Sequence, residues 1–287
     1  MFKGGEWAAA LGIFAALPAS RVCPDLACCQ CAARACGLGG SWQSAAEVLV
    51  AMRRCRVADD GSVLDAVVWA HEASGQRPPL PQRGLKAAAV KKEAAVLDFV
   101  RRRAPPGDVA AAVRAVECFA EEREWLKVAG GAKARLLESS LRPGDRVLEF
   151  GTYVGYSALV MARRLRELGG GSIVSCEVDS FVALVARAML DWAGAEEVEV
   201  RVGAAADWLA AGRLGSADVL LLDHRGTRYR EDLAAAEPLL ARGARVLADN
   251  VLLPGAPLFI HFIEGRYATA VHELSEFARP GLRDWLV

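Results

Sequence analysis

From residue 146 onward, short apolar runs alternate with Ala/Leu-rich stretches of helical length, and this alternation constrains the fold more than any other feature. The runs are RVLEFG (146–151), SIVSCEV (172–178), ADVLLLD (217–223) and ARVLADN (244–250). Strands and helices that alternate in this way form a parallel sheet with helices on both faces. We therefore expect an α/β, Rossmann-like fold whose ligands bind at the carboxyl ends of the strands.

Charge and composition argue against several classes of function. The 287 residues include 35 basic and 35 acidic side chains, a balance that opposes bulk attraction to nucleic acid or anionic membranes. No uncharged apolar run reaches the roughly 18–20 residues of a membrane-spanning helix. Six of the eight cysteines lie in the first fifth of the chain, and a chain this long needs no disulfides. We expect reduced thiols and a monomeric, cytoplasmic protein.

The N-terminal quarter contains an internal repeat. GGEW at residues 4–7 recurs as GGSW at 39–42, and matches continue at this 35-residue step in pairs such as Arg21/Arg56 and Asp25/Asp60. Each copy has an apolar helical stripe, a break and a second apolar stretch, which predicts a helix-turn-helix unit. The two copies, over about residues 4–75, resemble pentatricopeptide repeats, a family that binds single-stranded RNA.

RNA binding through residues 1–75 remains an alternative that two observations oppose. This segment carries six basic and seven acidic side chains, so it offers no net attraction to phosphates. It also has two copies, whereas about three repeats are usually needed to stack stably. These observations favour a packing role. The Pro-rich stretch GQRPPLPQRG (75–84) predicts a linker at about residues 76–85, between domains at 1–75 and 86–287. Beyond the linker, residues 90–103 and 109–125 have the pattern of amphipathic helices.

Two further interpretations of the N-terminal segment have simpler rivals. Lys3 followed by the apolar residues 7–19 resembles a signal peptide, but Glu6 interrupts the basic leader and the repeat explains the apolar stretch. Cys28 and Cys31 form a CxxC pair, which other cysteines nearby (Cys23 and Cys36) would have to complete into a zinc site. A single CxxC placed within a helix favours small buried thiols instead.

The turn after the first apolar run has the character of a nucleoside site. In EFGTYVGYS (149–157), Gly151 and Gly155 let the backbone approach a ligand closely. Their spacing differs from the GxGxxG pattern that holds a pyrophosphate. Glu177, at the end of the next run, is placed to accept both hydroxyls of a ribose. The pattern favours S-adenosylmethionine over another nucleotide or a plain tight turn.

Oxygen-bearing side chains follow the next two runs. ADVLLLD ends in Asp223, and ARVLADN ends in Asp249 and Asn250. Carboxylate and amide oxygens without thiol or imidazole favour a hard cation such as Mg²⁺. The alternative is that these residues cap helices and turns, which is their commonest role.

Four segments in register resemble the catechol O-methyltransferase family: REWLKVAGGAKARLL, RVLEFGTYVGYSALVMARRL, LLDHRGTRY and VLADNVLLPGAP. The resemblance extends over about residues 88–287. It implies a mostly parallel seven-stranded sheet, with S-adenosylmethionine and Mg²⁺ as cofactors. It also implies methyl transfer to a catechol or similar vicinal diol, as in catecholamine metabolism.

The resemblance also assigns roles to individual residues. It implies that Asp223, Asp249 and Asn250 bind the metal. It implies a cofactor site made of Glu149, Gly151, Tyr153, Gly155, Tyr156, Ser157, Glu177, Ala205 and His224. Trp125 and Pro254 match the apolar walls of the acceptor site, and Glu276 matches the acid that binds the second hydroxyl. Asp223, Asn250 and Glu276 are then the catalytic residues.

The chemistry suits these residues, with one departure from the family. Methyl transfer is an in-line displacement that depends on positioning, and a metal chelated by both catechol oxygens lowers the pKa of the attacking hydroxyl. The family's lysine base, however, is replaced by Gly226, and its neighbouring tryptophan by Arg225. A positioned base contributes about 10²–10⁴ in rate, and arginine stays protonated. We expect a slow enzyme or a more acidic acceptor; a caffeoyl ester and a non-catalytic RNA-binding or scaffolding role remain alternatives.

Overall fold

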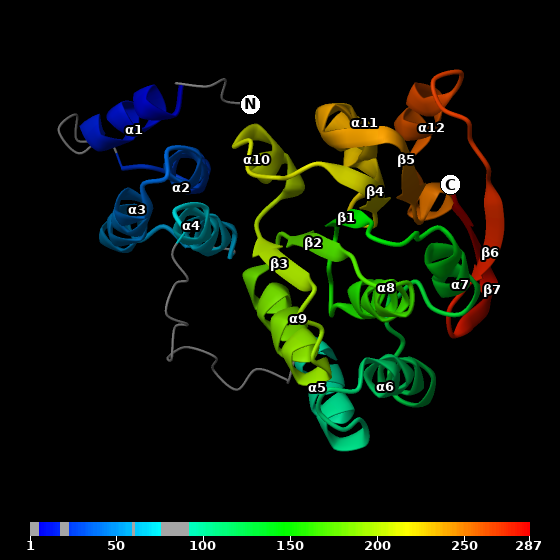
Figure 1. Ribbon diagram of the computed structural model, residues 1–287. Helices are drawn as coiled ribbons and strands as arrows, with labels where there is room; N and C mark the ends of the chain where they lie inside the picture. The colour runs from blue at the N-terminus through cyan, green and yellow to red at the C-terminus, as the bar shows by residue number, and fades with distance from the viewer. Residues whose placement is uncertain (1–5, 18–22, 59–60, 76–91) are drawn as a thin grey trace. The chain divides into compact units, whose positions relative to one another are not determined.

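The computed structural model describes residues 6–17, 23–58, 61–75 and 92–287 (Figure 1). The chain divides into two compact units. One comprises the N-terminal helices with the short segments 178–180 and 201–212, and the other comprises the remainder of the chain from residue 86. The predicted linker at residues 76–85 lies outside the described residues. None of the described helices is both long and apolar enough to span a membrane.

The N-terminal segment forms two helix pairs, as the repeat predicts. The helices are α1 (Glu6–Ala16), α2 (Leu26–Leu38), α3 (Trp42–Cys55) and α4 (Ser62–Ala73). Asp25 caps α2, because its carboxylate accepts a hydrogen bond from the backbone N–H of Cys28 at 2.8 Å. Gly40 has a φ of 65°, a left-handed conformation that suits glycine at the turn into α3. The helical character of this segment is thus confirmed, while its assignment to two pentatricopeptide-like repeats stays a prediction.

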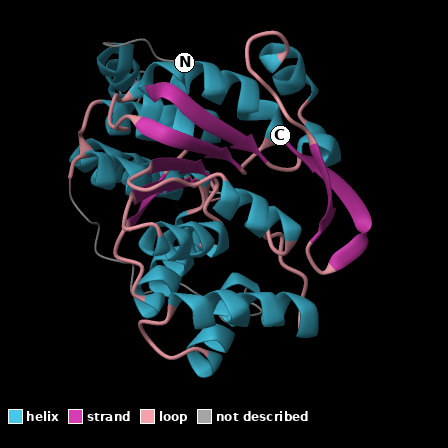
Figure 2. Ribbon diagram, turned by 45° about the vertical axis from the view of Figure 1, so that its right-hand side comes forward, coloured by secondary structure: helices cyan, strands magenta, loops and turns pink. Residues whose placement is uncertain are grey.

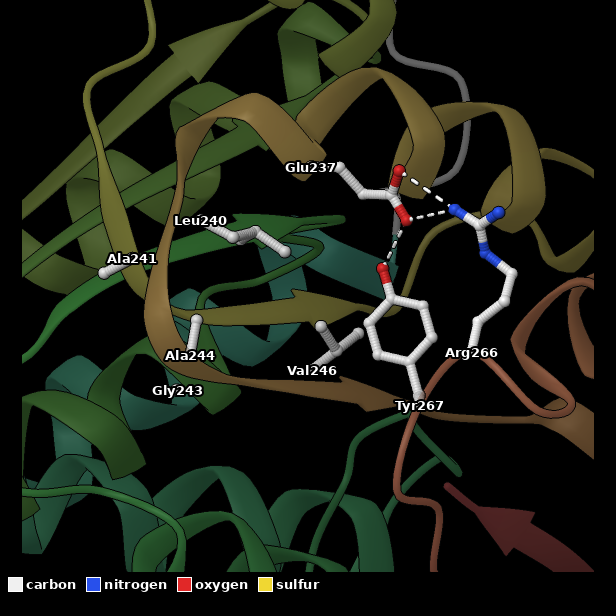
Figure 3. Close-up of a pocket in the computed structure, with 8 residues that line it drawn as sticks. All are labelled: Glu237, Leu240, Ala241, Gly243, Ala244, Val246, Arg266 and Tyr267. Carbon is white, nitrogen blue, oxygen red and sulfur yellow. Dashed lines mark hydrogen bonds and ion pairs between the residues drawn. The ribbon is translucent and has the colours of Figure 1, made fainter.

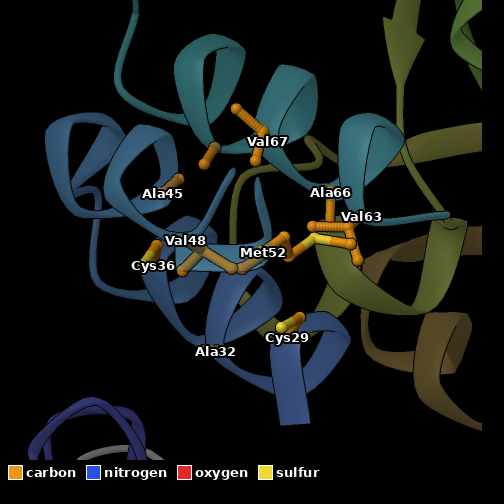
Figure 4. Packing of buried hydrophobic residues seen from close by; sticks show 11 residues of the cluster. Cys29, Ala32, Cys36, Ala45, Val48, Met52, Val63, Ala66 and Val67 are labelled. Carbon is orange, nitrogen blue, oxygen red and sulfur yellow. The ribbon is translucent and has the colours of Figure 1, made fainter. Parts of the chain in front are cut away.

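Small side chains from α2, α3 and α4 fill the core of this unit (Figure 4). Cys29 and Cys36, seven residues apart on one face of α2, are buried in it. The prediction of buried thiols is wrong for the CxxC pair, because Cys28 and Cys31 lie on the exposed face of the same helix. In the described part of the chain, no cysteine belongs to a group of three potential metal ligands.

A five-stranded sheet forms the centre of the second unit. Its strands are β1 (Arg146–Phe150), β2 (Ser172–Glu177), β3 (Val198–Val202), β4 (Ala217–Leu222) and β5 (Leu240–Ala248), in the order β3-β2-β1-β4-β5. Strand β1 pairs in parallel with β2 and β4, and β4 pairs in parallel with β5. The central strands β1 and β4 are almost entirely buried, as expected for a sheet covered on both faces. The predicted Rossmann-like sheet is confirmed.

Helices surround this sheet. The chain enters the unit through α5 (Lys92–Arg103), α6 (Val109–Glu122) and α7 (Ala132–Ser139). The helices of this unit that follow are α8 (Tyr156–Glu167), α9 (Ser180–Ala193), α11 (Tyr229–Ala236) and α12 (Pro257–Ile263), while α10 (Ala205–Ala210) belongs to the first unit. Figure 1 shows α8 and α9 on one side of the strands and α11 and α12 on the other, and Figure 2 shows the strands lying between helices.

Two more strands complete the unit. Strands β6 (His272–Glu276) and β7 (Arg279–Leu286) form an antiparallel hairpin. Val287, directly after β7, exchanges two backbone hydrogen bonds with Ala248 at the end of β5, at 2.8 and 3.0 Å. The seven strands are therefore present, but five form the parallel sheet and two form a hairpin attached to its edge at one point. This attachment brings the hairpin to the carboxyl end of β5.

Candidate active site

The two aspartates predicted to bind metal follow neighbouring strands. The backbone N–H of Asp223, after β4, donates to the carbonyl of Phe150, and that of Asp249, after β5, donates to the carbonyl of Leu222, both at 2.9 Å. Burial raises the pKa of Asp223 well above its usual range, and the nearby Asp249 and Glu149 carboxylates raise it further. The parallel register therefore brings negative charge together at one edge of the sheet, as the sequence predicts.

A buried lysine lies against this acidic edge. The Lys133 side chain, from α7, is fully buried, and its Nζ lies 2.6 Å from Asp249 Oδ1. The same ammonium is paired with Glu276 and lies 4.0 Å from Asp284 Oδ2. Burial alone would lower the pKa of Lys133, but the Asp249 and Glu276 carboxylates outweigh it and raise the pKa. Lys133 is therefore a permanent internal cation.

Asp284 fixes the orientation of Asn250. The Nδ2 group of Asn250 donates to Glu276 Oε1 at 2.9 Å and to Asp284 Oδ2 at 2.5 Å. The other oxygen of Asp284 accepts the backbone N–H groups of Leu252 and Leu253, each at 3.0 Å. With its amide nitrogen between two carboxylates, Asn250 keeps its Oδ1 atom for another partner.

Three side chains thus have oxygen atoms that are not hydrogen-bonded within the described part of the protein: Asp223 (both), Asp249 (Oδ2) and Asn250 (Oδ1). Hard oxygen donors that follow adjacent strands can hold a hard divalent cation. A second acidic group, Asp249, Glu276 and Asp284, has oxygens within 4.8 Å of one another, and the ammonium of Lys133 lies among these three carboxylates and offsets one of their charges. Because Lys133 already occupies that group, the oxygens that could hold a cation are those of Asp223, Asp249 and Asn250.

Lys133 and Asp284 are not among the residues predicted from the sequence. Lys133 belongs to the segment REWLKVAGGAKARLL, and the charge of a lysine in a helix normally indicates an exposed face. Asp284 follows the LSEF stretch by several residues and reaches Asn250 through the pairing of β6 with β7. The sequence feature that could have pointed to Asp284 is its charge at the start of the short apolar stretch DWLV.

Most of the predicted cofactor residues, those within 149–157 and Glu177, lie at the carboxyl ends of β1 and β2. Glu149 is fully buried, and its two carboxylate oxygens accept hydrogen bonds from the hydroxyls of Ser157 and Ser175. Glu177, at the end of β2, accepts the backbone N–H of Tyr153 at 2.9 Å. Glu149 therefore holds α8 and β2 together, while Glu177 is only partly buried at the strand end where a ribose is expected.

Glycine is favoured at the two positions of this turn for different structural reasons. Gly151 has a φ of 103°, and a Cβ there would lie 2.4 Å from the backbone oxygen of Asp223. The close approach that requires this glycine is therefore to the end of β4. Gly155 precedes α8 with a φ of 86°. Tyr156, the first residue of α8, is buried and donates its hydroxyl to Glu117 at 2.5 Å.

One buried ring nitrogen of His224 has no hydrogen-bond partner in the described residues. Its Nε2 lies 2.8 Å from Asp232 Oδ2, which favours a proton on Nε2. Its Nδ1 is buried and has no hydrogen-bond partner in the described residues, so it is an acceptor open to a ligand donor. The ring lies between Phe150 and Tyr229, with centroid distances of 5.9 and 5.1 Å. Ala205, the remaining predicted cofactor residue, is the buried first residue of α10.

The predicted acceptor side lies at the β6–β7 hairpin. The indole N–H of Trp125 donates to the carbonyl of Phe277 at 3.0 Å, next to the Glu276 carboxylate. Pro254 lies in the turn Val251–Gly255, whose first residues are held by Asp284. The structure thus places Glu276 beside Asn250 and Trp125 beside the residue that follows Glu276.

Gly226, where the family has a lysine base, is closely packed. A Cβ at this position would lie 2.6 Å from the backbone oxygen of Gly255. Any side chain here requires the turn Val251–Gly255 to move, so a lysine does not fit the present backbone. The loss of the base and the close packing of this turn are consistent with one another.

A hollow elsewhere in this unit has a different character (Figure 3). It has a volume of 530 Å³ and lies along β5, lined by Glu237, Leu240, Ala241, Gly243, Ala244, Val246, Arg266 and Tyr267. Its one carboxylate is already bound, because Glu237 accepts from Arg266 at 2.9 Å and from Tyr267 at 2.6 Å. None of the predicted site residues lines it, and its charges are satisfied internally.

Replacing Glu149 with glutamine is expected to flatten the pH dependence of stability. Burial raises the pKa of Glu149 from 4.5 to about 7. Between these values the folded protein holds a proton that the unfolded chain has released, so this contribution is complete below pH 4.5 and lost as the pH rises through 7. We expect the wild type to lose about 2–3 kcal/mol more than the variant over this range, measured by urea unfolding without divalent cations. The exposed Glu167→Gln is the control, and equal pH slopes for Glu149→Gln and wild type would contradict the assignment.

Comparisons with known proteins show which family the chain resembles. A model described as a methyltransferase domain matches residues 148–251. The chain is 34% identical to mouse (Mus musculus) catechol O-methyltransferase over 183 residues, which cover 61% of this chain and 68% of that protein. It is also 34% identical to the human (Homo sapiens) transmembrane O-methyltransferase over 209 residues, 69% of this chain and 71% of that protein.

Solved structures show the same architecture. The O-methyltransferase TomG from Streptomyces achromogenes, solved in complex with S-adenosylmethionine, is 25% identical and superposes with a TM-score of 0.52, covering 67% of this chain and 93% of that one. From its fold, the arrangement of its strand-end residues and its similarity to these proteins, the chain belongs to the catechol O-methyltransferase family.

Proposed function

We propose that this methyltransferase uses S-adenosylmethionine and Mg²⁺ to methylate one hydroxyl of a catechol or a similar vicinal diol. The observation that carries the proposal is the set of three side chains with free oxygen atoms, Asp223, Asp249 and Asn250, beside the Glu276 carboxylate. The family to which the chain belongs and the cofactor in the structure of TomG support the same chemistry.

The donor set fits a single hard cation. Asp223 offers a carboxylate, Asp249 offers its Oδ2 and Asn250 offers its Oδ1, while Lys133 and Asp284 hold the remaining atoms of the last two. When bound there, Mg²⁺ supplies charge that lowers the pKa of a coordinated hydroxyl. Because Asp249 and Asn250 are already held in place, little ordering is required on binding.

The protein's own residues position the two reactants. Glu177 presents a carboxylate at the end of β2, suited to the two hydroxyls of a ribose. His224 Nδ1 is a buried acceptor that suits the amino group of adenine. Glu276 uses Oε1 for Lys133 and Asn250, so Oε2 is left for the second hydroxyl of the acceptor. Contacts of this kind would hold the two reactants in the orientation that an in-line displacement requires.

No lysine base stands at Gly226, so the proton of the attacking hydroxyl has to leave to solvent or be absent at the start. Acceptors with a more acidic hydroxyl are therefore expected to react faster at neutral pH. A positioned base contributes about 10²–10⁴ in rate, so we expect the methylation rate of ordinary catechols to be lower by about this factor.

The proposal is tested by transfer of labelled methyl groups to a panel of phenols. We expect 4-methylcatechol to accept methyl and its isomer with hydroxyls in the 1,3 arrangement not to, and we expect EDTA to stop transfer and added Mg²⁺ to restore it. Asp223→Asn should lower the rate at least about tenfold, whereas Asp218→Asn, at the opposite end of β4 and paired with Arg146 at 2.8 Å, should not. No methylation of any vicinal diol between pH 7 and 9 would refute the proposal.

A further inference from the structure

An arginine lies over the aromatic ring at the predicted acceptor site. The guanidinium carbon of Arg279, the first residue of β7, is 4.1 Å from the centroid of the Trp125 ring. Arg279 is exposed, and no ion pair with it occurs in the described part of the chain. Stacking on the indole holds the guanidinium in place while its N–H groups stay available.

The backbone of Arg279 is paired with that of Glu276, which would bind an acceptor hydroxyl. Arg279 is the cross-strand partner of Glu276, and the turn between them consists of two residues, Phe277 and Ala278. The Phe277 carbonyl accepts the indole N–H of Trp125. The Glu276 carboxylate in turn bonds Asn250. A ring whose hydroxyls face Glu276 and Asn250 would therefore carry its substituent toward the Trp125–Arg279 pair.

The other charges around Trp125 are of both signs. Lys92 Nζ donates to the backbone carbonyl of Trp125 at 3.3 Å, and Lys127, two residues further on, is exposed. Glu276 is paired with Lys133, and Glu273 is paired with Arg283 at 2.5 Å. Glu93, which accepts the hydroxyl of Tyr153 at 3.2 Å, and the exposed Glu124 have no ion pair in the described part of the chain and offset the two lysines, so the excess positive charge is that of Arg279.

We propose that Arg279 recognises a carboxylate on the acceptor, so that the protein selects catechols with an anionic substituent over catechols with an amine. A guanidinium binds a carboxylate through two parallel hydrogen bonds and repels an ammonium. The Trp125 ring keeps the Arg279 guanidinium in position, which reduces the conformational entropy lost on binding. This inference rests on the proposed function and specifies its substrate class.

The test compares three catechols whose substituents are anionic, cationic and neutral: 3,4-dihydroxyphenylacetate, dopamine and 4-methylcatechol. For the wild type we expect kcat/KM to be at least about fivefold higher for the acid than for the amine, the size of an exposed ion pair. Arg279→Gln should remove this difference and Arg279→Glu should reverse it, with each kcat/KM divided by that of the same protein for 4-methylcatechol. Arg283→Gln, on the same strand but paired with Glu273, is the matched control and should keep the preference.

The outcomes separate this inference from the proposed function. If 4-methylcatechol is methylated but the acid has no advantage, or if Arg279→Gln keeps the advantage, Arg279 does not select the acceptor and the proposed function stands. If no catechol is methylated, the proposed function fails. Calorimetric titration of dihydroxyphenylacetate and dopamine, with S-adenosylhomocysteine and Mg²⁺ present, then decides the inference without turnover. Equal binding of the two compounds, or no binding of either, would overturn it.

Discussion

Replacing Lys133 with methionine is expected to lower the free energy of unfolding by about 3–5 kcal/mol, the usual cost of removing one partner of a buried ion pair. The ammonium is fully buried, 2.6 Å from Asp249 and paired with Glu276. Methionine nearly preserves the volume, so a cavity contributes little. The loss comes instead from the carboxylates, which remain buried without their cation.

The control for this variant is an ion pair of the same type at the surface. Arg103 and Glu122 are paired at 3.1 Å, and each side chain is 46% exposed, so Arg103→Met should change stability by no more than about 0.5 kcal/mol. Both variants are measured by urea unfolding in EDTA. Adding Glu276→Gln to Lys133→Met should recover part of the loss, because one fewer carboxylate is then uncompensated. Unchanged stability of Lys133→Met would show that water, not Lys133, compensates these carboxylates.

Local sequence patterns were sufficient to predict the parallel sheet. Strands buried on both faces are continuous apolar runs, and parallel register brings their carboxyl ends to one edge. Asp223 and Asp249 therefore follow adjacent strands at the same edge, as the sequence indicates, while their metal-binding role stays a prediction. Strand β3 was not predicted, because the alternating residues of VEVRV lack the continuous apolar pattern of a central strand.

Contacts over long sequence distances were not predictable. Lys133 meets Glu276 across 143 residues, and Asn250 meets Asp284 across 34. Nothing in the local sequence of α7 marks its lysine as buried, and the β6–β7 pairing depends on a two-residue turn with Ala278 at a φ of 56°. Similarly, Gly226 looks in sequence like the loss of a base, whereas the structure shows a backbone contact with Gly255 that excludes a side chain.

Replacing Asp284 is expected to have two separable effects. One is on the stability of the protein, and the other is on the orientation of the Asn250 amide. Its Oδ1 accepts the backbone N–H groups of Leu252 and Leu253 at 3.0 Å and that of Trp285 at 2.7 Å, and its Oδ2 accepts the amide of Asn250. Asp284→Ala removes the acceptor of the three backbone N–H groups and one of the two acceptors of the Asn250 amide, which keeps Glu276. Since each buried unsatisfied group costs about 1–3 kcal/mol, we expect a loss of about 3 kcal/mol or more in urea unfolding.

Asp284→Asn isolates the second part, the orientation of Asn250. An asparagine keeps one oxygen for the backbone N–H groups, so stability should fall by less than half as much as in Asp284→Ala. Its new NH₂ group, however, would face the NH₂ group of Asn250, which favours rotation of the Asn250 amide. Rotation turns the Oδ1 atom away from the position proposed for the cation, and disturbing an outer partner of a ligand typically costs 10–100-fold in metal affinity. We therefore expect the Mg²⁺ dissociation constant, measured by calorimetry, to rise by about that factor. An unchanged constant, with the stability loss of Asp284→Ala still observed, would mean that Asp284 holds the turn and has no part in presenting the amide oxygen.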